Sequence, residues 1–191
     1  MGLLDALRGK TKQIKPNLDA LFALPTAALT MATQLDLTSS GVAGVCYKLG
    51  SGASELTTDA EIQALLEVPT DASAVSYVTD DLGFRWVVIQ NADLGELVTR
   101  VHGVHSTLSD HGLGPRLLCS VFGFVPATPP GEGAVRLVYL TKSGTFYPFA
   151  PRDKQSRDNE LEIRVRTFLS NDLPIEPELS KWMALWGLPV T

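Results

Sequence analysis

The chain has 191 residues, 45% of them hydrophobic and 19% charged, with 16 basic and 21 acidic side chains and two cysteines. The apolar content excludes a disordered chain, and the net charge of -5 argues against a nucleic-acid binder. Two cysteines cannot form a disulfide-rich secreted scaffold, and no apolar run reaches the roughly 20 residues that span a bilayer. The length matches about one domain, which we expect residues 16–191 to form.

Residues 1–15 form a basic, amphipathic N-terminal segment before that domain. Three leucines and then four basic side chains follow one another: Leu3, Leu4, Leu7, Arg8, Lys10, Lys12 and Lys15. A secretory signal peptide has the opposite order, so the sequence predicts a cytoplasmic protein. An apolar turn beside basic residues is able to contact an anionic membrane surface or a partner protein. The alternative is a short segment that docks on the domain or frays.

In the first half of the domain, periodicity and turn residues predict helices at 18–24 and 25–32, a turn at 39–41, a strand at 42–49, a helix from 58 or 59 to 67, and a hairpin of strands at 75–79 and 84–90. Asn17 is the expected cap of the first helix, and Pro25 begins the second. Gly83 provides the positive φ that the hairpin turn requires.

In the second half, the same signals predict a helix at 94–111, a strand at 116–125, a hairpin of strands at 135–141 and 145–149, and helices at 158–169 and 177–186. Asp93 and Glu96 form a capping box at the start of the long helix, and Gly112 ends it. The carboxylates near the start of the 158–169 helix, Glu162 among them, are predicted to face solvent.

The strand at 117–125 is apolar on both of its pleat faces, and residues 86–89 and 135–140 repeat the pattern. A half-exposed strand would alternate apolar with polar side chains. Both faces of the sheet must therefore be covered, by helices on each side or by helices and a second subunit. The sequence predicts one α+β domain, a mostly antiparallel sheet of five or six strands with packed helices, and strand 117–125 away from the sheet edge. Because the early helices are short and alanine-rich, we expect a two-fold homodimer to cover the remaining apolar surface.

The candidate chemical groups are few, and we expect no catalytic residue, cofactor or metal. His102 and His105 share one helix and could bind a metal ion or line a ligand pocket. No third metal ligand accompanies them, so the sequence favours ordinary packing of both histidines.

Cys46 and Cys119 are predicted to be reduced and buried. Trp182 and Trp186 are four apart; core packing is favoured, with an exposed anchor for a partner as the alternative. The residues that we assign to partner or membrane contact are Leu3, Leu4, Leu7, Arg8, Lys10, Lys12, Trp182 and Trp186.

Segments along nearly the whole chain resemble the PspAB family of PspA-associated proteins, named for phage shock protein A. They are MGLLDAL at 1–7, PNLDALFALPTAA at 16–28, GVAGVC at 41–46, DLGFRWVV at 81–88, residues 97–124, NELEIR at 159–164 and WMALWGLP at 182–189. The resemblance implies a cytoplasmic accessory of an envelope-stress system, with no established active site to transfer. Residues 97–124 are also similar to YbjN-type and type III secretion chaperone-like domains, but a shared fold does not dictate function.

We therefore expect a non-enzymatic protein-binding module whose partner is a PspA-like membrane-stress protein, in the cytoplasm or peripheral to the inner face of the cell membrane. The alternative is a small-ligand sensor or small enzyme that uses a pocket near His102 and His105.

Overall fold

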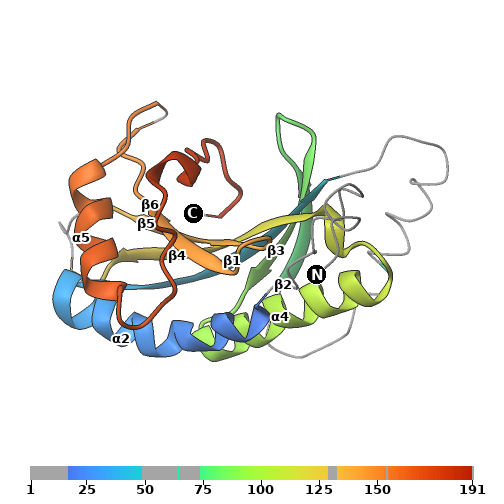
Figure 1. The fold of residues 1–191 in the computed structure, drawn as a ribbon, viewed down its shortest axis with the longest axis horizontal. Helices are drawn as coiled ribbons and strands as arrows, with labels where there is room; N and C mark the ends of the chain where they lie inside the picture. The colour runs from blue at the N-terminus through green and yellow to red at the C-terminus, as the bar shows by residue number, and fades with distance from the viewer. Residues whose placement is uncertain (1–16, 49–63, 65–73, 129–132, 154, 191) are drawn as a thin grey trace, which may run out of the picture.

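The computed structural model describes residues 17–48, 64, 74–128, 133–153 and 155–190, and six strands among them form one sheet (Figure 1). The strands are β1 (Leu37–Lys48), β2 (Ala74–Thr79), β3 (Phe84–Gln90), β4 (Leu117–Pro126), β5 (Val135–Leu140) and β6 (Thr145–Phe149). They lie in the order β2-β3-β1-β4-β5-β6, and every neighbouring pair is antiparallel. The predicted α+β class, both hairpins and the interior position of β4 are confirmed.

Strand β1 is longer than predicted, because the expected turn at 39–41 is part of it. Its pairing with β4 shifts register between Ser39 and Ala43, which is a β-bulge within a continuous strand. Gly41 lies in the bulge with a φ of +74°, a conformation that favours glycine. The carbonyl of Gly41 accepts a hydrogen bond of 2.9 Å from the backbone N–H of Asn91. The Ser-Ser-Gly signal therefore marks a bulge and not the end of a strand.

The helices pack their apolar sides together against one face of the sheet. They are the 3-10 helix η1 (Leu18–Ala23), α2 (Leu24–Leu35), α4 (Leu94–Asp110) and α5 (Asn159–Leu169), and their buried apolar residues belong to one cluster. Figure 1 shows α2 and α4 beneath the sheet, with α5 beside α2. The Asp93 carboxylate accepts a hydrogen bond of 3.0 Å from the Glu96 N–H, as predicted for the start of α4. The predicted helix ending at residue 67 lies outside the described residues, apart from Ala64.

On the opposite face of the sheet lies the C-terminal segment, residues 174–190, so the alternative of helices on both faces is wrong. The alternative of a second subunit stays a prediction. The predicted helix at 177–186 is also wrong, because these residues contain only the 3-10 turn η3 (Leu179–Lys181). The segment begins as an extended chain beside β6: Phe146 N–H donates to Pro174 O, and Glu176 N–H donates to Phe146 O, each at 2.8 Å. These bonds between distant residues hold the backbone outside the helical conformation.

The continuous stretch Leu18–Leu35, which comprises η1 and α2, has a mean hydropathy of 1.2 and is long and apolar enough to cross a membrane by length and composition. The sequence pattern predicts two separate helices here, at 18–24 and 25–32, and no membrane span. Leu21, Leu24 and Met31 of this stretch are fully buried in the cluster beneath the sheet. Packing within the protein accounts for these apolar side chains.

Candidate protein-binding surface

The C-terminal segment is held in place by Trp182, which packs into a second apolar cluster on the sheet face that the helices leave open. The indole ring stacks on Tyr147 with a centroid distance of 6.1 Å, and its N–H donates to Glu176 O at 3.1 Å. Only 6% of Trp182 is exposed. Trp182 is therefore a core residue, and its assignment as a contact for a partner is wrong.

Hydrogen bonds and an ion pair of charged side chains connect the middle of the segment to β6 and α5. The Glu162 carboxylate is buried, accepts a hydrogen bond of 2.8 Å from the Ala150 N–H and pairs with Arg157 at 2.8 Å. Arg157 in turn donates to Trp182 O at 2.9 Å and lies over the ring of Phe149. The prediction that Glu162 faces solvent is wrong, because the Ala150 backbone and the Arg157 guanidinium, both before the helix, turn this carboxylate toward the protein interior.

The end of the segment lies directly on the sheet at Gly44. Val190 is buried beside Trp86, and a Cβ atom added to Gly44 would lie 2.7 Å from Val190 Cγ2 and 3.1 Å from the Trp86 ring. The side-chain N–H at Nε of Arg136 donates to Val190 O at 2.6 Å. Glycine at position 44 therefore allows the chain to approach β1 closely.

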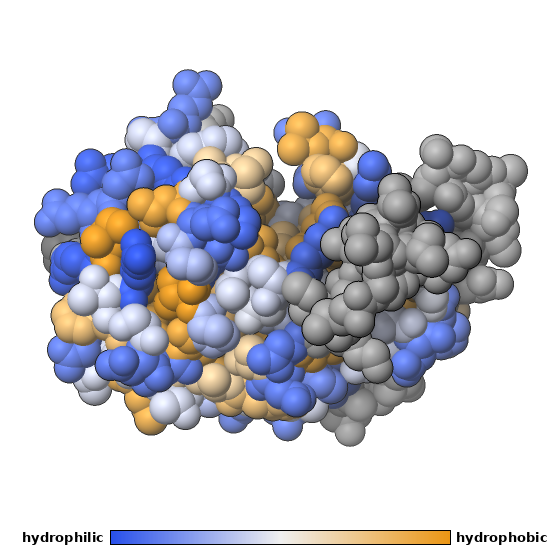
Figure 2. Space-filling view, in the orientation of Figure 1, coloured by the Kyte–Doolittle hydropathy of each residue, from blue (hydrophilic) through white to orange (hydrophobic). Residues whose placement is uncertain are grey.

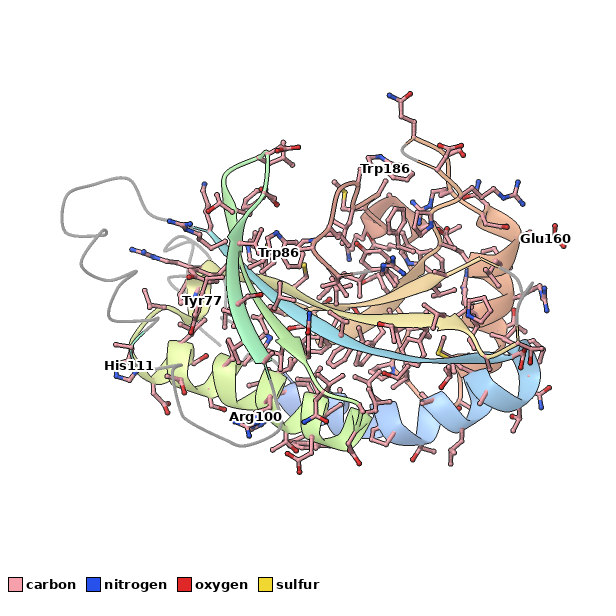
Figure 3. The ribbon with its side chains drawn as sticks, turned by 180° about the vertical axis from the view of Figure 1, so that it is seen from behind. Tyr77, Trp86, Arg100, His111, Glu160 and Trp186 are labelled. Atoms are coloured by element: carbon pink, nitrogen blue, oxygen red, sulfur yellow. The ribbon has the colours of Figure 1, made fainter. Side chains whose placement is uncertain are left out.

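The outer side of the same segment exposes three large apolar side chains, which we call the apolar strip: Leu179, Met183 and Trp186. Their exposed fractions are 52%, 61% and 40%. Trp186, labelled in Figure 3, meets the Phe149 ring edge-on with a centroid distance of 5.0 Å. Of the two predicted tryptophans, Trp186 is thus the one that lies at the surface.

A pocket of about 320 Å³ opens beside Trp186. Its lining includes the apolar side chains of Phe149, Leu185, Trp186 and Leu188 and the charged side chains of Arg136 and Asp153. It lies on the C-terminal-segment side of the sheet, whereas Figure 3 places Arg100 and His111 of the α4 region on the other side. No local sequence pattern predicts this pocket, because its lining comes from β5, β6, the loop after β6 and the C-terminal segment.

A second exposed apolar feature is the tip of the β2–β3 hairpin. Leu82 is almost fully exposed there, and Figure 2 shows hydrophobic residues reaching the surface at this tip. The turn of the hairpin is held by Asp80, which accepts hydrogen bonds from the N–H groups of Leu82 and Phe84 at 3.0 and 2.9 Å.

Of the two histidines of the predicted site, His105 is buried and His102 is partly exposed. His105 is fully buried, and its Nε2 lies 2.6 Å from Ser120 Oγ, also fully buried. Burial and the neighbouring His102 lower the pKa of His105 to about 4, so the ring is neutral at pH 7. His102 itself packs on Phe22 with ring centroids 5.0 Å apart. In the part of the chain that the structure describes, no group of three or more His, Cys, Asp or Glu side chains is placed to hold a metal ion.

Cys46 and Cys119 are buried as predicted, and the structure adds that they face each other across β1 and β4. The hydrogen bond between the thiols and their burial raise the pKa of Cys46. A protonated, buried thiol is a poor nucleophile, so the pair packs as two small apolar side chains. The contact residues predicted at 3–12 lie outside the described residues.

Comparison with protein-family models gives one finding: the family PspAB, described as PspA associated protein B, matches residues 1–190. Comparison with curated proteins and with solved structures gave no match.

Proposed function

Because the chain belongs to the PspAB family, we propose that it is a non-enzymatic accessory protein that binds PspA as part of a cytoplasmic envelope-stress system. The family description names an association with PspA, and the exposed apolar strip is the surface that we assign to it. This strip is the observation that carries the proposal.

The strip has the properties of a protein-binding surface. Methionine and tryptophan are enriched in interfaces relative to the rest of the surface, and tryptophan often contributes a large share of the binding energy. The buried side chains of Trp182 and Val190 fix the backbone on either side of Met183 and Trp186. A partner therefore meets apolar side chains on a backbone that is already ordered, which lowers the entropic cost of binding.

The alternative of an enzyme or ligand sensor at His102 and His105 receives less support from this geometry. The His105 and Ser120 side chains lie within hydrogen-bond distance, as a base and a nucleophile would. A substrate must reach such a pair, however, and both residues have an exposed fraction of 0%. We therefore assign the pair to packing between α4 and β4.

We further propose that the protein is cytoplasmic and reaches the inner face of the cell membrane through its N-terminal segment. The sequence supports this with Leu3, Leu4 and Leu7 followed by Arg8, Lys10 and Lys12. The test is co-sedimentation with phosphatidylglycerol vesicles and with phosphatidylcholine vesicles. Replacement of the three basic residues by glutamine should abolish sedimentation with the anionic vesicles; equal sedimentation of variant and native chain would contradict membrane contact.

A homodimer stays a prediction. The expectation of a dimer rests on an apolar sheet face that helices leave uncovered. Residues 174–190 cover much of that face. Light scattering over a concentration series decides, since a monomer has a mass of 20.6 kDa.

The principal experiment measures the affinity of the full chain for PspA from the same organism by biolayer interferometry. Trp186→Ala should weaken binding by about tenfold or more, as expected for a central aromatic contact. The matched control is Leu29→Ser on α2, which is 68% exposed on the helical side of the molecule and should leave binding unchanged. No binding by the native chain, or equal losses in both variants, would contradict the proposal.

A further inference from the structure

The pocket beside Trp186 contains an arginine that forms no ion pair with a carboxylate of the described residues. Arg136 lies on β5 directly opposite Phe149 on β6, and both residues line the pocket of about 320 Å³. Its Nε–H donates to Val190 O. Its Nη1 is buried and has no hydrogen-bond partner. Among the described residues, no carboxylate forms an ion pair with Arg136.

The other charged side chains in this region have hydrogen-bond or ion-pair partners of their own within the protein. Asp153 lines the same pocket, but its carboxylate accepts hydrogen bonds from the N–H groups of Gln155 and Ser156 and from the Ser156 hydroxyl. Arg152 pairs with Asp158, and Arg157 pairs with Glu162. Arg136 therefore provides a positive charge that is available to a ligand.

An unpaired, partly buried guanidinium is costly to the protein. Desolvation lowers the pKa of Arg136, which shows that its surroundings disfavour the charge without offering a compensating anion. The loss of hydration is offset only when an anion with good geometry completes the pair. A guanidinium N–H group that reaches a carboxylate donates a charge-assisted hydrogen bond, and such bonds are about twice as strong as neutral ones.

We propose that Arg136 binds the carboxylate of an aspartate or glutamate side chain of PspA, while an apolar neighbour of that residue enters the pocket against Trp186 and Leu188. This inference rests on the proposed function. A protein segment fits better than a free small molecule, because Trp186 belongs both to the pocket and to the apolar strip. A partner segment that covers the strip reaches the pocket at the same contact.

The experiment compares the full chain and its variants in binding to PspA. Arg136→Gln removes the charge and should weaken binding by about tenfold or more, since truncating one member of a desolvated charge pair has large effects on affinity. Arg136→Lys keeps the charge without the planar guanidinium group and should recover part of the loss. Arg100→Gln, the same change on the helical side of the sheet (Figure 3), should bind like the native chain.

Two further measurements separate recognition from a structural effect of Arg136 on the C-terminal segment. Val190→Ala loosens the same end of the segment while leaving Arg136 in place, and should weaken binding less than Arg136→Gln. A chain extended by two residues after Thr191 should bind PspA with the native affinity, which excludes the terminal carboxylate as the partner of Arg136. A loss for Val190→Ala as large as that for Arg136→Gln would overturn the inference.

The identity of the contact is tested by double-mutant cycles. Each aspartate and glutamate of PspA is changed to the corresponding amide and measured against native and Arg136→Gln chains. One PspA carboxylate should lose its effect when Arg136 is already replaced. If PspA binds and Trp186→Ala weakens it, but Arg136→Gln binds normally or no carboxylate couples, the inference is wrong and the proposed function stands. If the native chain does not bind PspA, the proposed function fails and this inference with it.

Discussion

The two faces of the sheet are covered in different ways. On one face, η1, α2, α4 and α5 bury a large cluster of apolar side chains in regular secondary structure. On the other, residues 174–190 cover a smaller cluster with almost no regular structure, and specific hydrogen bonds from Trp182, Arg157 and Arg136 hold them. Burial of apolar surface stabilises the first face, whereas the covering of the second face depends on a few individual contacts. The second face also carries the pocket, where the charged side chain of Arg136 lies beside exposed Trp186.

The largest effect is expected in the helical face. Phe124 on β4 has an exposed fraction of 0% and belongs to the cluster beneath the sheet. Phe124→Ala removes a buried ring and leaves a cavity, and should lower the free energy of unfolding by about 3–5 kcal/mol. Urea denaturation followed by circular dichroism measures the change. A loss below about 1 kcal/mol would mean that this cluster does not dominate stability.

The sequence predicted the helical face well because its signals are local. The apolar spacing and the Asp93 cap of α4 depend on residues within one helix, and both were confirmed. The two-sided apolar pattern of β4 correctly placed it inside the sheet.

The C-terminal face could not be predicted in the same way. Leu179, Trp182, Met183 and Trp186 have helical spacing, yet pairing of residues 174–176 with Phe146 decides the backbone. The opposition of Cys46 and Cys119 depends on strand register. The pocket at Arg136 depends on which distant segments meet, and no local pattern records that.

The second prediction concerns His105, which joins the helical face to β4. Its pKa in the folded protein is lowered to about 4, whereas an unfolded chain has a histidine pKa of about 6.5. At pH 7 both states hold a neutral ring. Between about pH 6.5 and pH 4 only the unfolded state takes up the proton, so the free energy of unfolding should fall as the pH falls, by about 3 kcal/mol in total.

Urea denaturation at a series of pH values tests this dependence. His105→Gln keeps a polar group near Ser120 without a titrating ring, so the variant should lack this part of the pH dependence. The same slope in the variant and the native chain would show that other groups cause it.

The third prediction compares the stability of the two faces through one glycine substitution on each. Gly44→Ala places a methyl group 2.7 Å from Val190 Cγ2 and should cost about 1–3 kcal/mol through overpacking. Gly103→Ala, in α4, meets no atom within 4 Å and should stabilise the protein by about 0.5–1 kcal/mol through higher helix propensity. Thermal unfolding measures both.

The consequences for binding should differ as well. Gly44→Ala should displace the end of the C-terminal segment and weaken the proposed binding to PspA, while Gly103→Ala should bind normally. Native affinity of Gly44→Ala would show that the contact between Val190 and β1 does not support the binding surface.

The smallest effect on stability is expected on the outer side of the C-terminal segment. Leu179 and Met183 are more than half exposed, and surface substitutions away from special contacts usually change stability by at most about 0.5 kcal/mol. Met183→Ser should therefore leave the urea midpoint nearly unchanged, although Met183 is adjacent to Trp182, whose indole is buried. The proposed function requires that the same substitution weakens binding to PspA. Strong destabilisation by Met183→Ser would place this side chain in the core, and the apolar strip would then lose its central residue as a contact for a partner.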